Sequence, residues 1–163
     1  MPTLLIVYHS LTGGTRQMAE AALAGARTEA DTTTRLLPAR DTLPEDVLGA
    51  DGYLFATPEN LASMAGVMKD FFDRCYYPVL DRINGRAYAL MVCAGSDGSG
   101  AARQVARIAT GWRLKEAGPP LIVCTHAQTP EAILAPKTIG ADDLRACAEL
   151  GAALATGLAA GIF

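Results

Sequence analysis

The sequence predicts an α/β protein with a doubly wound, five-stranded parallel sheet in the order 2-1-3-4-5. Short apolar segments alternate with helical segments along all 163 residues. The apolar segments lack the in-out alternation of half-exposed strands, which indicates a sheet covered by helices on both faces. No linker or repeat divides the chain, so residues 1–163 are expected to form one domain.

The first half of the chain supplies three strands. An apolar run after Thr3 is rich in Leu, Ile and Val, and the helix Gln17–Ala26 follows it. Thr32–Leu37 is rich in β-branched and apolar residues and predicts the second strand. A short helix is expected within Asp41–Leu48, and Asp51–Ala56 predicts the third strand.

The second half continues the alternation. A stripe formed by Met68, Phe71, Phe72 and Cys75 predicts an amphipathic helix from about Ala65 to Tyr77. The other predicted elements, in order, are a strand at Ala87–Cys93, a helix with Ala102, Val105, Ala106, Ala109 and Trp112 on one stripe, a strand at Leu121–Cys124, and a helix from about Ala141 to Gly157. We expect Trp112 to pack against the sheet.

Composition excludes several classes of function. The chain carries 14 basic and 17 acidic residues, a net charge of −3, so a basic nucleic-acid surface is not expected. The apolar tract Leu150–Phe163 is too short and too weakly hydrophobic to span a membrane. No secretion signal is visible after Met1, and we expect a cytoplasmic protein.

Neither a metal site nor a catalytic triad is predicted. Cys75, Cys93, Cys124 and Cys147 are widely spaced, which argues against a zinc site and a disulfide framework and favours buried thiols. His9 and His126 lie at predicted strand ends without an evident partner, and a histidine in that position is more often structural. No residue is therefore assigned a catalytic role.

The junction between the first strand and the first helix is the main candidate site. Small hydroxyl and glycine residues fill it, and the predicted binding residues are Ser10, Leu11, Thr12, Gly13, Gly14 and Thr15. Hydroxyls and open N–H groups at a helix N-terminus suit a phosphate. The loop has neither the lysine of a P-loop nor the Gly-x-Gly-x-x-Gly of a dinucleotide fold. An ordinary turn with a helix cap is the structural alternative.

The motif Ser10-x-Thr12-Gly13-x-Thr15 resembles the phosphate loop of flavodoxin-like FMN-binding proteins. The segment that begins at Thr57 and Pro58 is similar to the Thr-Pro loop of NAD(P)H-dependent FMN reductases and quinone reductases. This resemblance implies that the second loop, from Pro58 to Leu61, lines a flavin ring. The predicted binding residues of this segment are Thr57, Pro58, Glu59, Asn60 and Leu61. A rigid turn that restrains Thr57 and Pro58 is the alternative.

A third glycine-rich loop follows the fourth predicted strand. Its candidate residues are Ala94, Gly95, Ser96, Asp97 and Gly98. Backbone N–H groups here would face the pyrimidine edge of a flavin, whose carbonyl and N–H groups need partners. The carboxylate of Asp97 could instead cap the following helix. Right-handed crossovers place all three loops at the same edge of the sheet, where the strands have their carboxyl ends. Ligands of doubly wound sheets bind at this edge, at the point where the winding direction reverses.

The resemblance implies FMN as the cofactor. Electron-carrier flavodoxins usually stack aromatic side chains from the second and third loops on the ring, and neither loop here contains one. An open ring face suits NADH or NADPH as co-substrate and a small acceptor such as a quinone, so we expect a reductase. The alternatives are an FMN electron carrier with a protein partner and a degenerate member that has lost FMN. The resemblance also makes a homo-oligomer plausible.

Overall fold

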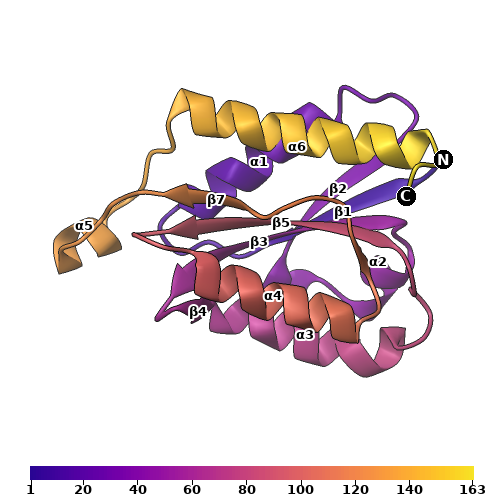
Figure 1. Ribbon diagram of the computed structural model, residues 1–163, viewed down its shortest axis with the longest axis horizontal. Helices are drawn as coiled ribbons and strands as arrows, with labels where there is room; N and C mark the ends of the chain where they lie inside the picture. The colour runs from indigo at the N-terminus through magenta and orange to yellow at the C-terminus, as the bar shows by residue number, and fades with distance from the viewer.

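The computed structural model describes all residues 1–163, and its centre is a twisted parallel sheet (Figure 1). The parallel strands are β1 (Thr3–Tyr8), β2 (Thr33–Pro38), β3 (Gly52–Asn60), β5 (Ala87–Ala94), β6 (Lys115–Glu116) and β7 (Leu121–Cys124). Their order is β2-β1-β3-β5, and β6 and β7 both pair with the outer edge of β5. The predicted order 2-1-3-4-5 is confirmed. The labels differ because a short strand, β4 (Ser63–Met64), is counted.

Helices cover both faces of this sheet (Figure 1). One face carries α1 (Gly14–Ala26) and α6 (Ala141–Ala159). The opposite face carries α2 (Pro44–Leu48), α3 (Gly66–Val79) and α4 (Ser99–Gly111). The remaining helical segments are a 3₁₀ turn at Ala39–Asp41 and α5 (Pro130–Leu134). The sheet is therefore buried on both sides, as its apolar strands require.

Alternation along β3 divides the core into two layers. Tyr53 and Phe55 belong to the cluster under α3 and α4, whereas Leu54 and Ala56 belong to the cluster under α1 and α6. The indole of Trp112 packs edge-on against Phe55, with ring centroids 6.4 Å apart, and the residue is only 3% exposed. The expectation that Trp112 packs against the sheet is confirmed.

The third strand is longer than predicted. It was predicted to end at Ala56, but β3 continues through Pro58 to Asn60 and turns back into antiparallel β4. The strand tolerates Pro58, which has no N–H, because β1 ends opposite Ala56. Beyond that point β3 is paired with β5 on one side, so fewer of its N–H groups are needed for the sheet. The second loop is thus the end of a hairpin.

The fifth strand is divided, whereas a single strand was predicted. Lys115–Glu116 forms β6 before the predicted strand, and Ala117 still donates its N–H to the Tyr88 carbonyl at 2.8 Å. Gly118-Pro119-Pro120 then interrupts the pairing, because proline has no N–H to donate. Pairing resumes at Leu121, opposite Met91.

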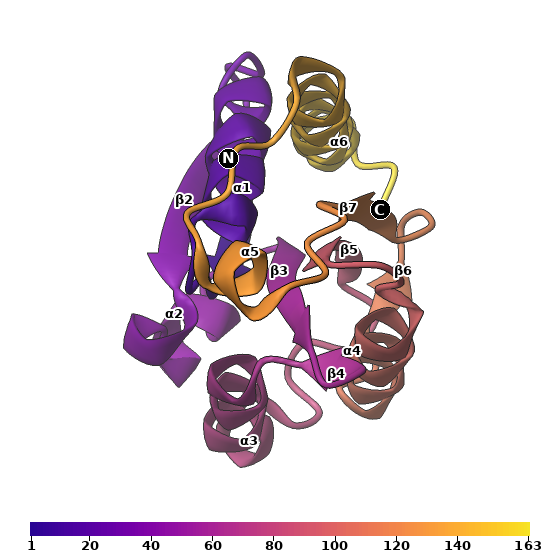
Figure 2. The same cartoon turned by 90° about the vertical axis from the view of Figure 1, so that its left-hand side faces the viewer.

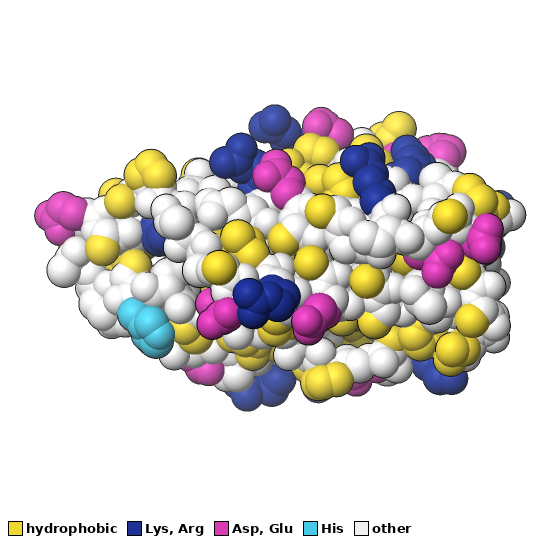
Figure 3. All heavy atoms as spheres, turned by 90° about the horizontal axis from the view of Figure 1, so that it is seen from above, with side chains coloured by type: hydrophobic (Ala, Val, Ile, Leu, Met, Phe, Trp, Pro, Cys, Tyr) yellow, Lys and Arg dark blue, Asp and Glu magenta, His cyan; other side chains and the backbone are white.

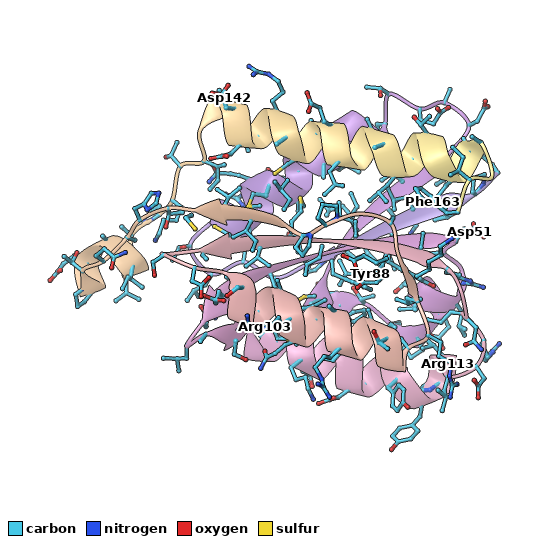
Figure 4. All side chains as sticks on the ribbon, in the orientation of Figure 1. Asp51, Tyr88, Arg103, Arg113, Asp142 and Phe163 are labelled. Atoms are coloured by element: carbon cyan, nitrogen blue, oxygen red, sulfur yellow. The ribbon has the colours of Figure 1, made fainter.

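The surface shows mixed charge and a favourably charged last helix. Asp142, labelled in Figure 4, and Asp143 lie in the first turn of α6, as predicted, where carboxylates complement the helix dipole. The face seen in Figure 3 intersperses basic, acidic and apolar side chains. None of the helices combines the length and apolar character needed to cross a membrane.

Candidate functional site

The carboxyl ends of the parallel strands meet at one edge of the sheet, which faces the viewer in Figure 2. A pocket of about 120 Å³ opens there between the loops after β1, β3 and β5. The predicted residues that line it are Ser10, Leu11, Thr12, Gly14, Thr15, Pro58, Glu59, Asn60, Ala94 and Gly95. Three segments far apart in the sequence are thus brought to one place.

Six predicted residues do not line this pocket: Gly13, Thr57, Leu61, Ser96, Asp97 and Gly98. Gly13 lines an adjoining cavity on the outer side of the first loop. Thr57 is fully buried, and its hydroxyl accepts the Ala65 N–H at 3.1 Å, which fixes the start of α3. The side chain of Leu61 is fully exposed at the hairpin tip.

The first loop leaves helix donors open. Gly13 adopts φ +93°, a left-handed conformation that favours glycine, and its N–H donates to the Ser10 hydroxyl at 3.2 Å. The N–H groups of Gly14, Thr15 and Arg16 have no acceptor within the chain. They add to the positive end of the α1 dipole. This cradle fits a phosphate group.

The start of α4 is different because the protein itself supplies acceptors for most of its N–H groups. Glu59 accepts the N–H of Gly98 at 2.9 Å and that of Ala101 at 3.0 Å. Asp97 accepts the N–H and the hydroxyl of Ser99, and these bonds lower the pKa of its carboxyl. Asp97 therefore binds the first residue of α4, which agrees with the alternative of a local role at the helix start. At the start of α4 one N–H group, that of Gly100, is left without an acceptor, whereas three are open at the start of α1.

The third loop offers donors of another kind. The N–H groups of Gly95, Ser96 and Asp97 have no acceptor within the chain. The carbonyls of Ala94 and Gly95 are already used, because they accept the N–H groups of residues 125 and 126 at 2.9 and 2.8 Å. Open donors beside a pocket suit the carbonyl edge of a heterocycle.

The tip of the β3–β4 hairpin holds its backbone in an unusual conformation. Leu61 and Ala62 have φ values of +53° and +59°, as in a two-residue type I′ turn, which normally carries Asn or Gly. Each such residue costs on the order of 1 kcal/mol. The sequence has no turn signal here, which is why the hairpin was not predicted. The turn leaves the Leu61 side chain exposed, one residue beyond Asn60, which lines the pocket.

Sequence reasoning missed six pocket residues: Cys93, Thr125, Ala127, Ile133, Leu134 and Lys137. Most belong to residues 125–140, a connection between β7 and α6 that we call the strap. The strap includes α5 and crosses in front of the sheet edge (Figure 2). The Thr129 hydroxyl accepts the Ala132 N–H at 3.2 Å, and Pro130 follows it. This helix-start signal could have predicted that a helix begins here, but not that the helix lies in front of the sheet edge.

Two titratable groups near the site have pKa values shifted so that their charged forms are disfavoured. Burial raises the pKa of the Cys93 thiol, while the nearby Lys137 acts in the opposite direction. Burial, and then the charge of Arg40, lower the pKa of His9. Neither His9 nor His126 lines the pocket, and no group of three His, Cys, Asp or Glu side chains is arranged to hold a metal.

The fold has many counterparts of known structure. A flavodoxin from the domain Archaea superposes with a TM-score of 0.77 over 96% of this chain and 98% of that chain, at 18% sequence identity. The chain therefore has the flavodoxin-like fold.

The profile of the family described as NADPH-dependent FMN reductase matches residues 17–117. The chain belongs to this family, and so to the FMN flavoproteins of oxidoreduction or electron transfer. It is 34% identical over 100 residues to a flavodoxin of Aquifex aeolicus, covering 61% of this chain and 54% of that protein. It is 32% identical over 94 residues to an NAD(P)H dehydrogenase (quinone) of Acidithiobacillus ferrooxidans, covering 45% and 47%. The chain spans about half the length of these curated relatives.

Replacing Glu59 is expected to loosen the hairpin from α4. In Glu59→Gln one carboxylate oxygen becomes an NH₂ group that cannot accept, so one N–H at the start of α4 loses its partner. We expect the free energy of unfolding to fall by about 1–2 kcal/mol, measured by urea denaturation. Glu20→Gln, on the exposed face of α1, is the control and should change it by less than about 0.5 kcal/mol. Equal stability of the two variants would contradict the capping role.

Proposed function

We propose that this protein is an FMN-dependent oxidoreductase that passes electrons from NADH or NADPH to a small acceptor such as a quinone. The site residues of the three loops are part of the same proposal. The first loop would hold the phosphate, residues 58–61 would lie along the ring, and the N–H groups of residues 95–97 would face its pyrimidine edge. Bound FMN would supply the chemistry of accepting a hydride from a reduced nicotinamide.

One observation carries the choice of a reductase. No aromatic side chain lines the pocket between the three loops. A flavin ring placed there would keep a face that no protein ring covers, which leaves room for a nicotinamide or a quinone to stack on it. The surrounding rim is apolar, because Leu11 and Leu134 line the pocket and are largely exposed. Such a rim suits a planar, weakly polar acceptor or a second subunit.

The polar groups of the pocket would position the cofactor rather than move protons. Glu59 lines the pocket, but both of its oxygens already accept N–H groups of the α4 start. His9, the histidine near the end of β1, does not line the pocket, and its pKa is lowered by burial. The protein would therefore bind, orient and partly shield the flavin, which supports an assignment without a catalytic side chain.

An electron carrier is the second candidate. It is favoured by the 34% identity to a flavodoxin over 100 residues. A carrier docks to a protein partner, and the exposed apolar side chains at the site edge would then contact that partner. The two candidates share the cofactor and differ in the electron donor.

Anaerobic reduction distinguishes the enzyme from the carrier. The FMN-loaded protein is expected to lose its oxidised flavin absorbance within minutes of adding NADH or NADPH, and a quinone is expected to restore it. Free FMN at the same concentration is the control and should remain oxidised over that time. If neither nicotinamide reduces the bound flavin while an added reductase does, the protein is a carrier. If the purified protein binds no flavin, both candidates fail.

A further inference from the structure

The strap is fastened directly onto the first loop. The side chain of Gln17 donates to the Lys137 carbonyl at 2.7 Å and accepts the Ile139 N–H at 3.0 Å. The Lys137 N–H donates to the Thr12 carbonyl at 2.9 Å. These three bonds fix the backbone of Lys137 beside a loop that is 125 residues away in the sequence.

The glycine at the start of α1 allows this close approach. A Cβ atom on Gly14 would lie 3.4 Å from the Lys137 Cβ and 2.8 Å from the Cys93 Sγ. The Lys137 side chain therefore begins next to the open N–H groups of α1. Its ammonium lies 3.4 Å from the Thr12 hydroxyl, inside the first loop.

The charge of this ammonium is not balanced by the protein. Its other close partners are the carbonyls of Ile133 and Ala135, at 2.7 and 2.6 Å, both within the strap. No carboxylate forms an ion pair with it. Lys137 is the one basic residue that lines the pocket, and the one acidic residue, Glu59, is bound to α4. A half-buried cation beside open helix donors favours an anion.

We propose that Lys137 is the countercharge for the phosphate of the bound flavin and makes the site selective for a phosphorylated flavin over riboflavin. The inference rests on the proposed function. The first loop supplies N–H groups and hydroxyls but no formal charge of its own, since Arg16 is exposed and lines the outer cavity. Lys137 supplies that charge from the strap. Binding of the phosphate would also hold the strap in place, because the same lysine contacts both.

The test compares FMN with riboflavin. Apoprotein is titrated with each flavin by fluorescence quenching, at low and at high salt. Lys137→Met keeps the apolar stem and removes the charge. We expect this variant to bind FMN about ten- to a hundredfold more weakly than the wild type. The affinity for riboflavin should change by less than about twofold. The weakening of FMN by salt should be smaller in the variant than in the wild type.

Two further variants sharpen the result. Lys137→Arg retains the charge and should recover most of the affinity for FMN. Lys69→Met is the matched control, because Lys69 is exposed on α3 and paired with Asp73 at 2.7 Å, and it should leave both flavins unchanged. Inorganic phosphate should compete with FMN and leave riboflavin binding unaffected.

The outcomes separate the inference from the proposed function. If the wild type binds FMN and Lys137→Met binds it equally well, the inference is wrong and the proposed function stands. If the variant loses both flavins to the same degree, Lys137 shapes the strap and does not recognise phosphate. If inorganic phosphate binds as tightly as FMN, the site selects an oxyanion rather than a flavin. A wild type that binds no flavin overturns both proposals.

Discussion

Gly14→Glu is expected to weaken FMN binding by about a thousandfold. The new carboxylate would occupy the pocket wall where the phosphate is proposed to lie, and two like charges about 4 Å apart repel by about 4 kcal/mol at an effective dielectric constant near 20. Because a Gly14 side chain would begin beside Lys137, the carboxylate would also pair with that ammonium in place of the phosphate. Titration of the apoprotein with FMN measures the loss.

Two controls separate charge from shape. Gly14→Ala adds only a methyl group, which meets the Cys93 sulfur at 2.8 Å, so it should affect FMN and riboflavin to a similar and smaller degree. Gly111→Glu adds the same charge at the last residue of α4, where nothing lies within 4 Å of a new Cβ, and should leave FMN binding unchanged. A folded Gly14→Glu variant that binds FMN as the wild type does would show that the phosphate lies elsewhere.

Gly151→Ala is expected to lower the free energy of unfolding by about 1–3 kcal/mol, or the melting temperature by roughly 3–10 °C. Helices α1 and α6 approach so closely that a Cβ on Gly151 would overlap the Ala22 carbonyl oxygen, and one on Gly25 would overlap that of Ala148. The obstacle is backbone rather than a flexible side chain, so the helices must separate. Thermal unfolding followed by circular dichroism measures the change.

The control for this change has the opposite sign. Gly111→Ala also replaces a helical glycine, but a Cβ there meets nothing within 4 Å. Gly111→Ala should leave the free energy of unfolding unchanged or raise it by up to about 1 kcal/mol, because alanine is the better helix former. If both variants gain stability equally, the α1–α6 contact can relax and the close approach is not limiting.

The sequence by itself determined the order of the elements. Apolar strands alternate with helices, and a parallel sheet with right-handed crossovers then has few arrangements, so the order 2-1-3-4-5 could be predicted. The cradle at Ser10–Thr15 was also predictable, because strand, glycine turn and helix start are contiguous there. Local residues suffice to define an open helix N-terminus.

Tertiary structure decided which groups complete the site. Glu59 lines the pocket as part of the predicted site, and its oxygens also accept the N–H groups of Gly98 and Ala101. This pairing exists only once β3 and α4 lie side by side. The hairpin at Leu61 and Ala62 carries no turn signal, so packing against α4 fixes it.

Lys137 is the clearest example of a site residue that the sequence alone could not predict. Nothing near Lys137 in the sequence resembles a phosphate site. It reaches the first loop because the Gln17 side chain binds the Lys137 carbonyl and the Ile139 N–H of the strap. Contacts between residues 120 and 122 positions apart depend on the path of the whole chain, which short motifs do not encode. The sequence therefore determined the fold and the open N-terminus of α1, whereas the folded chain alone placed a positive charge beside it.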